Sequence, residues 1–344
     1  MSGPGRGGLR AALRALRGDQ PELPPGAGEL SEEDRRYLTT LHDESVPLPP
    51  GAALELAHDN PRLADLREAY TALDLGVLEG SHWHRDAIES FLDLRWFRGE
   101  SLFTWHYREP KRVTELKYFT YMSYVAGQDD LGLLERLEED GAFGCWTFEY
   151  EGRGRVSRDL LDSVNEINFL ERELGIFGRD GLRVLDVGAG YGRLAHRMAV
   201  AVPDLADHCC VDAIPEATFL SDYYLHYRGA VPPARVVRLD RIEAELETGA
   251  FDLALNVHSF SECTHSAVEW WVEMLTRLEV PVLFCIPNDG EKLLTTELDA
   301  SRRDFGPLLE RAGYRLRERR PVIEDPAARR LLRIEDRFHL FERG

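Results

Sequence analysis

The second half of the chain alternates short apolar runs with stretches of helical periodicity. Between residues 182 and 287 the apolar runs are LRVLDVG, DHCCVDA, ARVVRLD, FDLALNV and PVLFCIP. Such alternation predicts a parallel sheet with helices on both faces. Near the C-terminus, YRLRERRPVI and RFHLFERG follow one another, separated by a loop that contains Asp325 and Pro326. These two runs predict a terminal antiparallel pair of strands.

In the first half of the chain the apolar positions mostly follow helical spacing, and many of them are aromatic. Aromatic residues at this spacing are most often core, although exposed aromatic faces also stack on sugar rings. The last helix of this region is expected to begin after Ser157 and to end before Gly175. We expect Asp162, Asn165 and Glu166 on its polar face to be solvated, with a reach into the functional site as the alternative.

Breaks in composition suggest three parts of the chain. The Pro/Gly-rich runs PELPPGAGEL and VPLPPGAA predict a flexible tail with short helices over residues 1–52, of which residues 1–30 are expected to be disordered. A helical cap or substrate region over 53–156 and a main domain over 157–344 follow. The Arg-rich start, MSGPGRGGLRAALRALRG, has amphipathic helical spacing, so a solvated tail, an organelle-targeting segment and a membrane-surface segment all stay open.

Charge and composition narrow the class of ligand. The net charge of −19 over 344 residues disfavours a nucleic-acid partner and favours a small molecule. No apolar run approaches the roughly 18 to 20 residues that cross a bilayer, so we expect no membrane span. Five cysteines without CxxC spacing predict neither a disulfide framework nor a zinc site. A cytoplasmic protein is the simplest interpretation, and a homo-oligomer is possible.

One short segment, VLDVGAGYGRLAHRM at residues 184–198, suggests a ligand site. Its glycines give GxGxG after a strand, and Arg193 stands where the third glycine of a dinucleotide-binding GxGxxG would be. Asp186, two residues before the first glycine, would repel a pyrophosphate but suits a cationic ligand. The segment therefore favours S-adenosylmethionine over NAD. Tyr191 would lie near the sulfonium or pack under the loop.

Two more acids are expected at strand ends. Asp212 follows the second strand, where an acid can bind ribose hydroxyls, and Asp240 is expected to end the third strand, near the adenine amino group. Together they predict an α/β fold with a Rossmann-like class I methyltransferase sheet, terminal antiparallel strands and a helical N-terminal cap domain. A Rossmann-like domain that has lost its ligand is the alternative. The expected cofactor-binding residues are Asp186, Gly188, Ala189, Gly190, Tyr191, Asp212, Ala213, Asp240, Arg241 and Asn256.

From residue 83 to the C-terminus, the sequence resembles the bacterial sugar O-methyltransferases, a branch of the class I S-adenosylmethionine-dependent enzymes. The resemblance is carried by GAGYGRLA, by VDAIPE with the following LSDYYL, and by NVHSFSEC. It implies cofactor contacts from Asp186, Gly188, Gly190, Tyr191 and Asp212. His258 and Cys263 depart from the family's last motif, which puts the acceptor and the base in doubt.

The segment NVHSFSECTHSAVEWW is expected to carry the chemistry. Ser266 and Glu269 have capping-box spacing, so a helix is expected to begin there and residues 257–265 to form a loop over the carboxyl edge of the sheet. His258 is the expected base, Glu262 would orient it or the acceptor, and His265 is the rival base. No metal is required by the spacing, although magnesium stays open on His258, Glu262, His265, Asn288 and Asp289.

These features predict an S-adenosylmethionine-dependent O-methyltransferase that acts on a sugar hydroxyl, in a nucleotide-linked sugar or a glycosylated natural product. In one alternative the enzyme uses the same methyl donor but methylates an oxygen or nitrogen of a non-sugar metabolite. The other alternative is a non-catalytic S-adenosylmethionine-binding partner subunit.

Overall fold

The computed structural model describes residues 31–73, 75–78, 83, 88–89, 91–99 and 102–344. The expected disordered segment and Arg-rich helix within residues 1–30 lie outside them. Two compact units make up the chain: Met1–His58, Arg85–Phe169 and Asp325–Ile334 form the first, and Asp59–His84, Leu170–Glu324 and Glu335–Gly344 form the second. The domain boundaries expected from the sequence stay a prediction.

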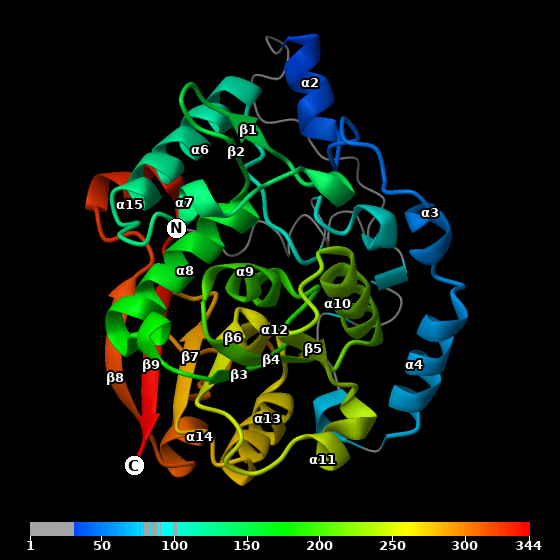
Figure 1. The fold of residues 1–344 in the computed structure, drawn as a ribbon, viewed down its shortest axis with the longest axis vertical. Helices are drawn as coiled ribbons and strands as arrows, with labels where there is room; N and C mark the ends of the chain where they lie inside the picture. Colours follow the sequence, from blue (N-terminus) through cyan, green and yellow to red (C-terminus); the bar gives the residue numbers. More distant parts are fainter. Residues whose placement is uncertain (1–30, 74, 79–82, 84–87, 90, 100–101) are drawn as a thin grey trace. The chain divides into compact units, whose positions relative to one another are not determined.

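The second unit contains a seven-stranded sheet of order β5-β4-β3-β6-β7-β9-β8 (Figure 1). Its first five strands in the sequence are parallel, whereas β9 runs antiparallel to β7 and β8. The expected α/β sheet with terminal antiparallel strands is therefore confirmed. The strands are β3 (Leu182–Val187), β4 (Leu205–Val211), β5 (Ala234–Val236), β6 (Leu253–Val257), β7 (Val282–Ile286), β8 (Tyr314–Pro321) and β9 (Arg337–Arg343).

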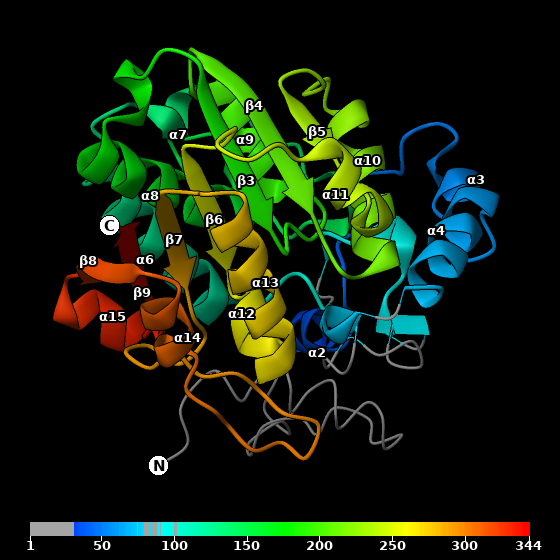
Figure 2. The ribbon, with the colours of Figure 1, turned by 90° about the horizontal axis from the view of Figure 1, so that it is seen from below.

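Helices cover both faces of this sheet, as its apolar parallel strands require. Helices α9 (Arg193–Ala201) and α10 (Pro215–Tyr227) lie on one face and α13 (His265–Arg277) on the other (Figures 1 and 2). Helix α4 (Pro61–Thr71) packs against α10, with a hydrogen bond of 2.9 Å between the hydroxyls of Tyr70 and Thr218. The remaining elements of this unit are η2 (Gly76–Leu78), η5 (Ile176–Gly178), η6 (Leu239–Arg241), α11 (Ile242–Glu245), α12 (Ser259–Glu262) and α14 (Gly306–Arg311).

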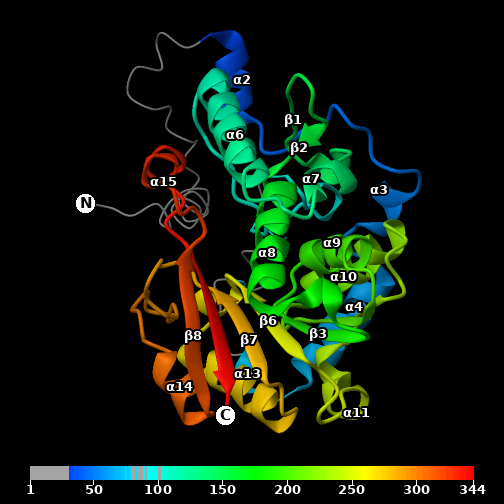
Figure 3. The same ribbon diagram turned by 60° about the vertical axis from the view of Figure 1, so that its left-hand side comes forward.

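The first unit is mainly helical among its described residues, in agreement with the expected N-terminal helical region. Figure 3 shows its longest helices, α6 (Lys111–Ala126) and α8 (Arg158–Leu174), the latter continuing into the second unit. The other elements are α2 (Glu32–Thr39), α3 (Ala52–Glu55), η3 (Leu94–Trp96), α7 (Leu133–Arg136), η4 (Ala142–Gly144), β1 (Phe148–Glu149), β2 (Arg155–Val156) and α15 (Pro326–Leu332). No helix among the described residues is long and apolar enough to cross a membrane.

Helix α8 confirms one expectation and corrects another. The Ser157 hydroxyl accepts a hydrogen bond from the Leu160 amide at 3.1 Å, so Ser157 caps the helix as expected. The expected solvated polar face is wrong, because Asn165 and Glu166 are buried. Asp162 on the same face accepts a 2.6 Å hydrogen bond from the Tyr121 hydroxyl. The polar face of the helix therefore packs inside the protein.

Four expectations about element boundaries are also corrected. Helix α13 begins at His265 and is capped by Thr264, whose hydroxyl accepts from the Ala267 amide, rather than by Ser266. The expected loop over 257–265 contains the short helix α12. The third strand, β5, ends at Val236 and leaves Asp240 in η6. Finally, the expected loop at Asp325 and Pro326 begins α15, with the Asp325 carboxylate accepting from the Ala328 amide at 2.7 Å.

Candidate functional site

The loop after β3 turns sharply at the carboxyl edge of the sheet. Gly188, Gly190 and Gly192 all have positive φ angles, of 71°, 59° and 80°, a backbone region that glycine enters without the penalty of a Cβ atom. The amides of Gly188 and Ala189 donate to the Val211 carbonyl at 2.8 and 3.3 Å. These bonds hold the loop against the end of β4.

Asp212 directly follows β4 and fixes the centre of the glycine loop. Its Oδ2 accepts from the Gly190 amide at 3.0 Å, and its Oδ1 accepts from the Ile214 amide at 2.9 Å. Three successive loop amides, from Gly188 to Gly190, therefore donate within the protein. Dinucleotide sites instead direct the donors of this loop and the following helix at a pyrophosphate. The observed bonding thus disfavours such a ligand here.

The Asp212 carboxylate is buried, and its pKa is raised to about 7. Burial is the main cause, the two amide hydrogen bonds oppose it, and the charges of Asp186 and Glu262 raise the pKa further. Each carboxylate oxygen has two lone pairs and uses one of them on an amide. Asp212 can therefore accept one more hydrogen bond on each oxygen, which suits the two hydroxyls of a ribose.

Asp186 lies at the end of β3, where its carboxylate is buried. The Asp186 Oδ2 is 3.3 Å from Nε2 of His208, a fully buried histidine on β4 that the sequence analysis did not select. Asp186 and Glu262 both lie close enough to Asp212 for their charges to raise its pKa. Three neighbouring carboxyl groups at one sheet edge create a negative potential that favours a cationic ligand.

Glu262 is the last residue of α12 and has two hydrogen-bond donors. The Trp83 indole Nε1 donates to its Oε2 at 2.9 Å, and the Asn288 amide donates to its Oε1 at 3.3 Å. Burial raises the pKa of Glu262, while these hydrogen bonds and the nearby His258 lower it. Trp83 was missed by the sequence analysis, because only the fold brings it to a residue so distant in the chain.

His258 follows β6 in a strained backbone conformation, with a φ angle of 67°. Its amide donates to the Ile286 carbonyl at 2.8 Å, which ties it to the end of β7. Its Nδ1 atom is buried and has no hydrogen-bond partner among the described residues. Non-glycine residues with positive φ cluster at functional sites. His258 therefore joins the carboxyl edge as a candidate proton acceptor, close enough to Glu262 to influence its pKa.

Gly188 and Asn256 connect the glycine loop to the region of His258. A Cβ atom on Gly188 would lie 2.1 Å from the Ser259 hydroxyl oxygen, so the two segments are in close contact. The buried Asn256 donates from Nδ2 to the Val187 carbonyl at 2.9 Å and accepts from the Phe260 amide at 3.0 Å. The side chain of Asn256 thus joins the ends of β3 and β6 and has a structural role here.

The other expected site residues have varied surroundings. His265 is the first residue of α13, and its amide donates to Glu297 at 3.0 Å. Tyr191 is buried edge-on against Tyr224, with ring centroids 5.3 Å apart, an arrangement that fits packing under the loop. Ala213 is half-buried directly after Asp212.

The expected strand-end position of Asp240 is wrong, as β5 ends earlier. Asp240 pairs instead with Arg238 at 2.9 Å. Its neighbour Arg241 is exposed and lies 3.3 Å from Glu245. Asp240 and Arg241 therefore form ion pairs with residues close to them in the sequence. Contact of either residue with a cofactor stays a prediction.

The residues on which the sequence left magnesium open do not gather around one point in the described part of the chain. Asp289 forms an ion pair with Arg302, while Glu262 has the partners given above. Among the described residues, the metal-type side chains whose ligand atoms lie within 4.8 Å of one another are instead Asp186, His208 and Cys210.

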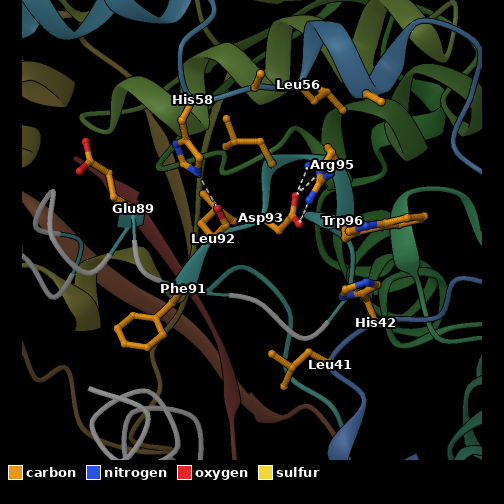
Figure 4. Close-up of a pocket in the computed structure, with 13 residues that line it drawn as sticks. Leu41, His42, Leu56, His58, Glu89, Phe91, Leu92, Asp93, Arg95 and Trp96 are labelled. Atoms are coloured by element: carbon orange, nitrogen blue, oxygen red, sulfur yellow. Dashed lines mark hydrogen bonds and ion pairs between the residues drawn. The ribbon is translucent and has the colours of Figure 1, made fainter. Parts of the chain in front are cut away.

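A separate cavity of about 520 Å³ lies within the first unit (Figure 4). The imidazole of His42 stacks on the Trp96 indole, with centroids 4.9 Å apart, and its Nε2 is 2.9 Å from the Glu44 carboxylate. Figure 4 also shows the paired Asp93 and Arg95 side chains, which are 2.6 Å apart. The lining is therefore partly apolar and partly made of planar polar groups.

Two glycines hold His42 in this cavity. Added Cβ atoms on Gly99 and Gly144 would lie 2.4 and 2.8 Å from the His42 Cβ, and Gly144 also has a positive φ angle of 80°. Larger residues would therefore displace His42 from its stack on Trp96. The arrangement of the stack depends on backbone contacts that the sequence pattern did not reveal.

No protein-family model matches the sequence, and no curated protein does either. Among solved structures, the cyclase SpnF is 14% identical with a TM-score of 0.40, covering 66% of this chain and 96% of its own. A SAM-dependent methyltransferase from Aquifex aeolicus is 18% identical with a TM-score of 0.36, covering 64% and 96%. The magnesium protoporphyrin IX methyltransferase ChlM from Synechocystis PCC 6803 is 14% identical with a TM-score of 0.38, covering 56% and 87%. Similarity at this level carries no information on activity or substrate.

Proposed function

We propose that the chain is an S-adenosylmethionine-dependent methyltransferase whose donor site is the carboxyl edge around Asp212. The observation that supports this most is the bonding of Asp212, which uses one lone pair of each oxygen on loop amides and keeps one for a ligand hydroxyl. The glycine-loop amides are already paired within the protein. The edge therefore offers acceptors and negative charge, which suits a cation bearing a ribose.

The residues present fit this cofactor. Asp212 would accept from the two ribose hydroxyls, and the charge of Asp186 would favour the ammonium and sulfonium groups of the donor. When bound, S-adenosylmethionine supplies an electrophilic methyl group on a cationic sulfur. Alignment and proton removal are then left to the protein, as in other transfers between positioned reactants.

In this proposal His258 removes the proton from the acceptor hydroxyl. It lies at the end of β6 beside the glycine loop, and its imidazole has a free buried nitrogen, Nδ1, among the described residues. Glu262, held by Trp83 and Asn288, orients His258 or the acceptor. A general base needs an atom that can accept the proton, and Nδ1 of His258 is such an atom.

The proposed acceptor is a sugar hydroxyl, in a nucleotide-linked sugar or a glycosylated natural product. This proposal is supported by the resemblance of GAGYGRLA, VDAIPE and NVHSFSEC to the motifs of the sugar O-methyltransferases.

Calorimetric titration with S-adenosylhomocysteine, with NAD as the control ligand, tests the donor assignment. Binding of S-adenosylhomocysteine alone is the expected result. Binding of NAD alone, or of neither compound, would overturn the assignment.

A panel of sugar and non-sugar acceptors with a labelled methyl donor tests the acceptor. Transfer to a sugar hydroxyl is expected. Transfer only to non-sugar compounds would refute the sugar proposal but not the donor assignment.

A further inference from the structure

Asp186 has two polar neighbours on the adjacent strand. The parallel pairing of β3 with β4 places Asp186 opposite Cys210 and Val184 opposite His208. Because side chains alternate along a strand, His208 and Cys210 project from the same face of β4, the face that Asp186 shares. The exposed fractions of Asp186, His208 and Cys210 are 4%, 0% and 1%, so His208 and Cys210 lie behind Asp186, which keeps a small exposed surface.

The hydrogen bonding of His208 indicates which nitrogen carries its proton. Nε2 is 3.3 Å from the Asp186 Oδ2, and a carboxylate oxygen can only accept from it. Nδ1 is buried with no hydrogen-bond partner among the described residues. A second proton on Nδ1 would therefore be a buried donor without an acceptor, which is costly. The geometry is best satisfied by neutral imidazole with its proton on Nε2.

We propose that His208 is a positioning residue for the methyl donor. Its Nε2–H group holds the Oδ2 atom of Asp186, so that the Oδ1 atom is oriented to accept from the α-ammonium group of the methyl donor. A protonated or differently oriented histidine would neutralise or rotate that carboxylate. This role rests on the proposed donor site.

A metal ion is the competing interpretation of the same three side chains. Asp186, His208 and Cys210 offer O, N and S ligands whose atoms lie within 4.8 Å of one another. However, the cluster offers three ligands, whereas structural zinc sites hold four. The 3.3 Å contact of His208 with Asp186 is already accounted for by a hydrogen bond. The observations favour the hydrogen-bonded pair.

The test compares two ligands and three variants by calorimetry. S-Adenosylhomocysteine carries the α-ammonium group, whereas 5′-methylthioadenosine lacks the amino-acid part. His208→Leu removes the hydrogen-bond donor to Asp186, whereas His208→Gln keeps an amide N–H near the position of Nε2. Cys210→Ala is the matched control from the same face of β4. His208→Leu is expected to weaken the binding of S-adenosylhomocysteine about tenfold, the order of magnitude of one hydrogen bond to a charged group. The affinity for 5′-methylthioadenosine is expected to be unchanged.

His208→Gln and Cys210→Ala are expected to bind both ligands like the wild type. In an Asp186→Asn background, His208→Leu is expected to have no further effect. Equal weakening of both ligands by His208→Leu would show a merely structural role and overturn the proposal. One zinc ion per chain that is lost in His208→Leu and Cys210→Ala would also overturn it.

Two observations on the wild type complete the test. Failure to bind S-adenosylhomocysteine would refute the donor site itself, and the role of His208 with it. Nitrogen-15 spectra of the imidazole provide a check that needs no variant to fold. A proton on Nε2 alone is expected, and a proton on Nδ1 would contradict the proposal.

Discussion

At the scale of single residues, Asp212 has the most informative environment. Two amides from the glycine loop and the start of α10 bond its carboxylate, while burial and two neighbouring acids raise its pKa to about 7. A strongly shifted carboxyl group in a ligand site makes binding depend on pH near neutrality. Because two amides already donate to this carboxylate, the ionised form is the one that can accept further hydrogen bonds from ligand hydroxyls on both oxygens.

The affinity for S-adenosylhomocysteine is expected to rise with pH. Asp212 is mostly protonated at pH 6 and mostly ionised at pH 8, and only the ionised form keeps all its lone pairs for hydroxyl donors. From a pKa of about 7, the ionised fraction, and with it the affinity, increases about tenfold over this range. Calorimetry at pH 6, 7 and 8 measures this change in affinity.

The Asp212→Asn variant should bind S-adenosylhomocysteine more weakly, by about 1.5 to 3 kcal/mol, and its affinity should no longer depend on pH. If the affinity of this variant still rises with pH, another group causes the pH dependence.

His258→Ala is expected to lower turnover by about 10² to 10⁴, the usual range for loss of a general base. Its affinity for S-adenosylhomocysteine should stay that of the wild type. His265→Ala, which removes the rival imidazole at the start of α13, serves as the matched control and should keep its turnover. If His265→Ala is the slow variant and His258→Ala the active one, the base has been assigned to the wrong histidine.

At the scale of elements, the glycine loop and α12 pack without room for a side chain. Gly188 combines a positive φ angle of 71° with the close approach of Ser259. Gly175, which ends α8, has a similar φ angle of 62° but no neighbouring atom within 4 Å of an added Cβ. The two positions therefore separate backbone strain from steric exclusion.

Gly188→Ala is expected to lower the free energy of unfolding by about 2 to 5 kcal/mol, the sum of backbone strain and overpacking. Gly175→Ala carries only the backbone term and should lower it by about 1 to 2 kcal/mol. Urea unfolding monitored by circular dichroism measures both. Ser259→Gly added to Gly188→Ala should recover the steric part. Equal losses at Gly188 and Gly175 would show that Ser259 moves aside freely.

At the scale of the whole molecule, the net charge of −19 and the acids at the sheet edge act in the same direction. Both favour a cationic ligand and disfavour a polyanion such as nucleic acid. The described residues of the proposed donor site, from Trp83 to Asn288, all belong to the second unit. Ligand binding should therefore stabilise that unit as a folded whole.

S-Adenosylhomocysteine at 100 times its Kd is expected to stabilise the folded protein by about 2.7 kcal/mol, through its preference for the native state. Thermal unfolding with and without the ligand measures this as a rise in Tm. NAD at the same concentration is the control and should leave Tm unchanged. A rise with NAD of equal size would point to a dinucleotide site.

The pattern of apolar and polar positions by itself determined the α/β class, the strands from β3 to β7 and the final antiparallel pair. Local spacing was sufficient there, because burial on both faces demands continuous apolar runs and the glycine loop requires positive φ angles. Helix boundaries were predicted less accurately where two residues can act as the N-cap, since Thr264 rather than Ser266 caps α13. Asp240 was misplaced because the apolar run ARVVRLD is longer than the strand it forms.

Only the tertiary structure decided which side chains meet. The hydrogen bond of Trp83 with Glu262, the pairing of Asp186 with His208 and the stack of His42 on Trp96 join residues whose separation in the sequence has no periodic signature. The same is true of the burial of Asn165 and Glu166, since an amphipathic helix pattern does not show what covers its polar face. Local sequence determines the elements, whereas these contacts depend on how distant segments of the chain pack against one another.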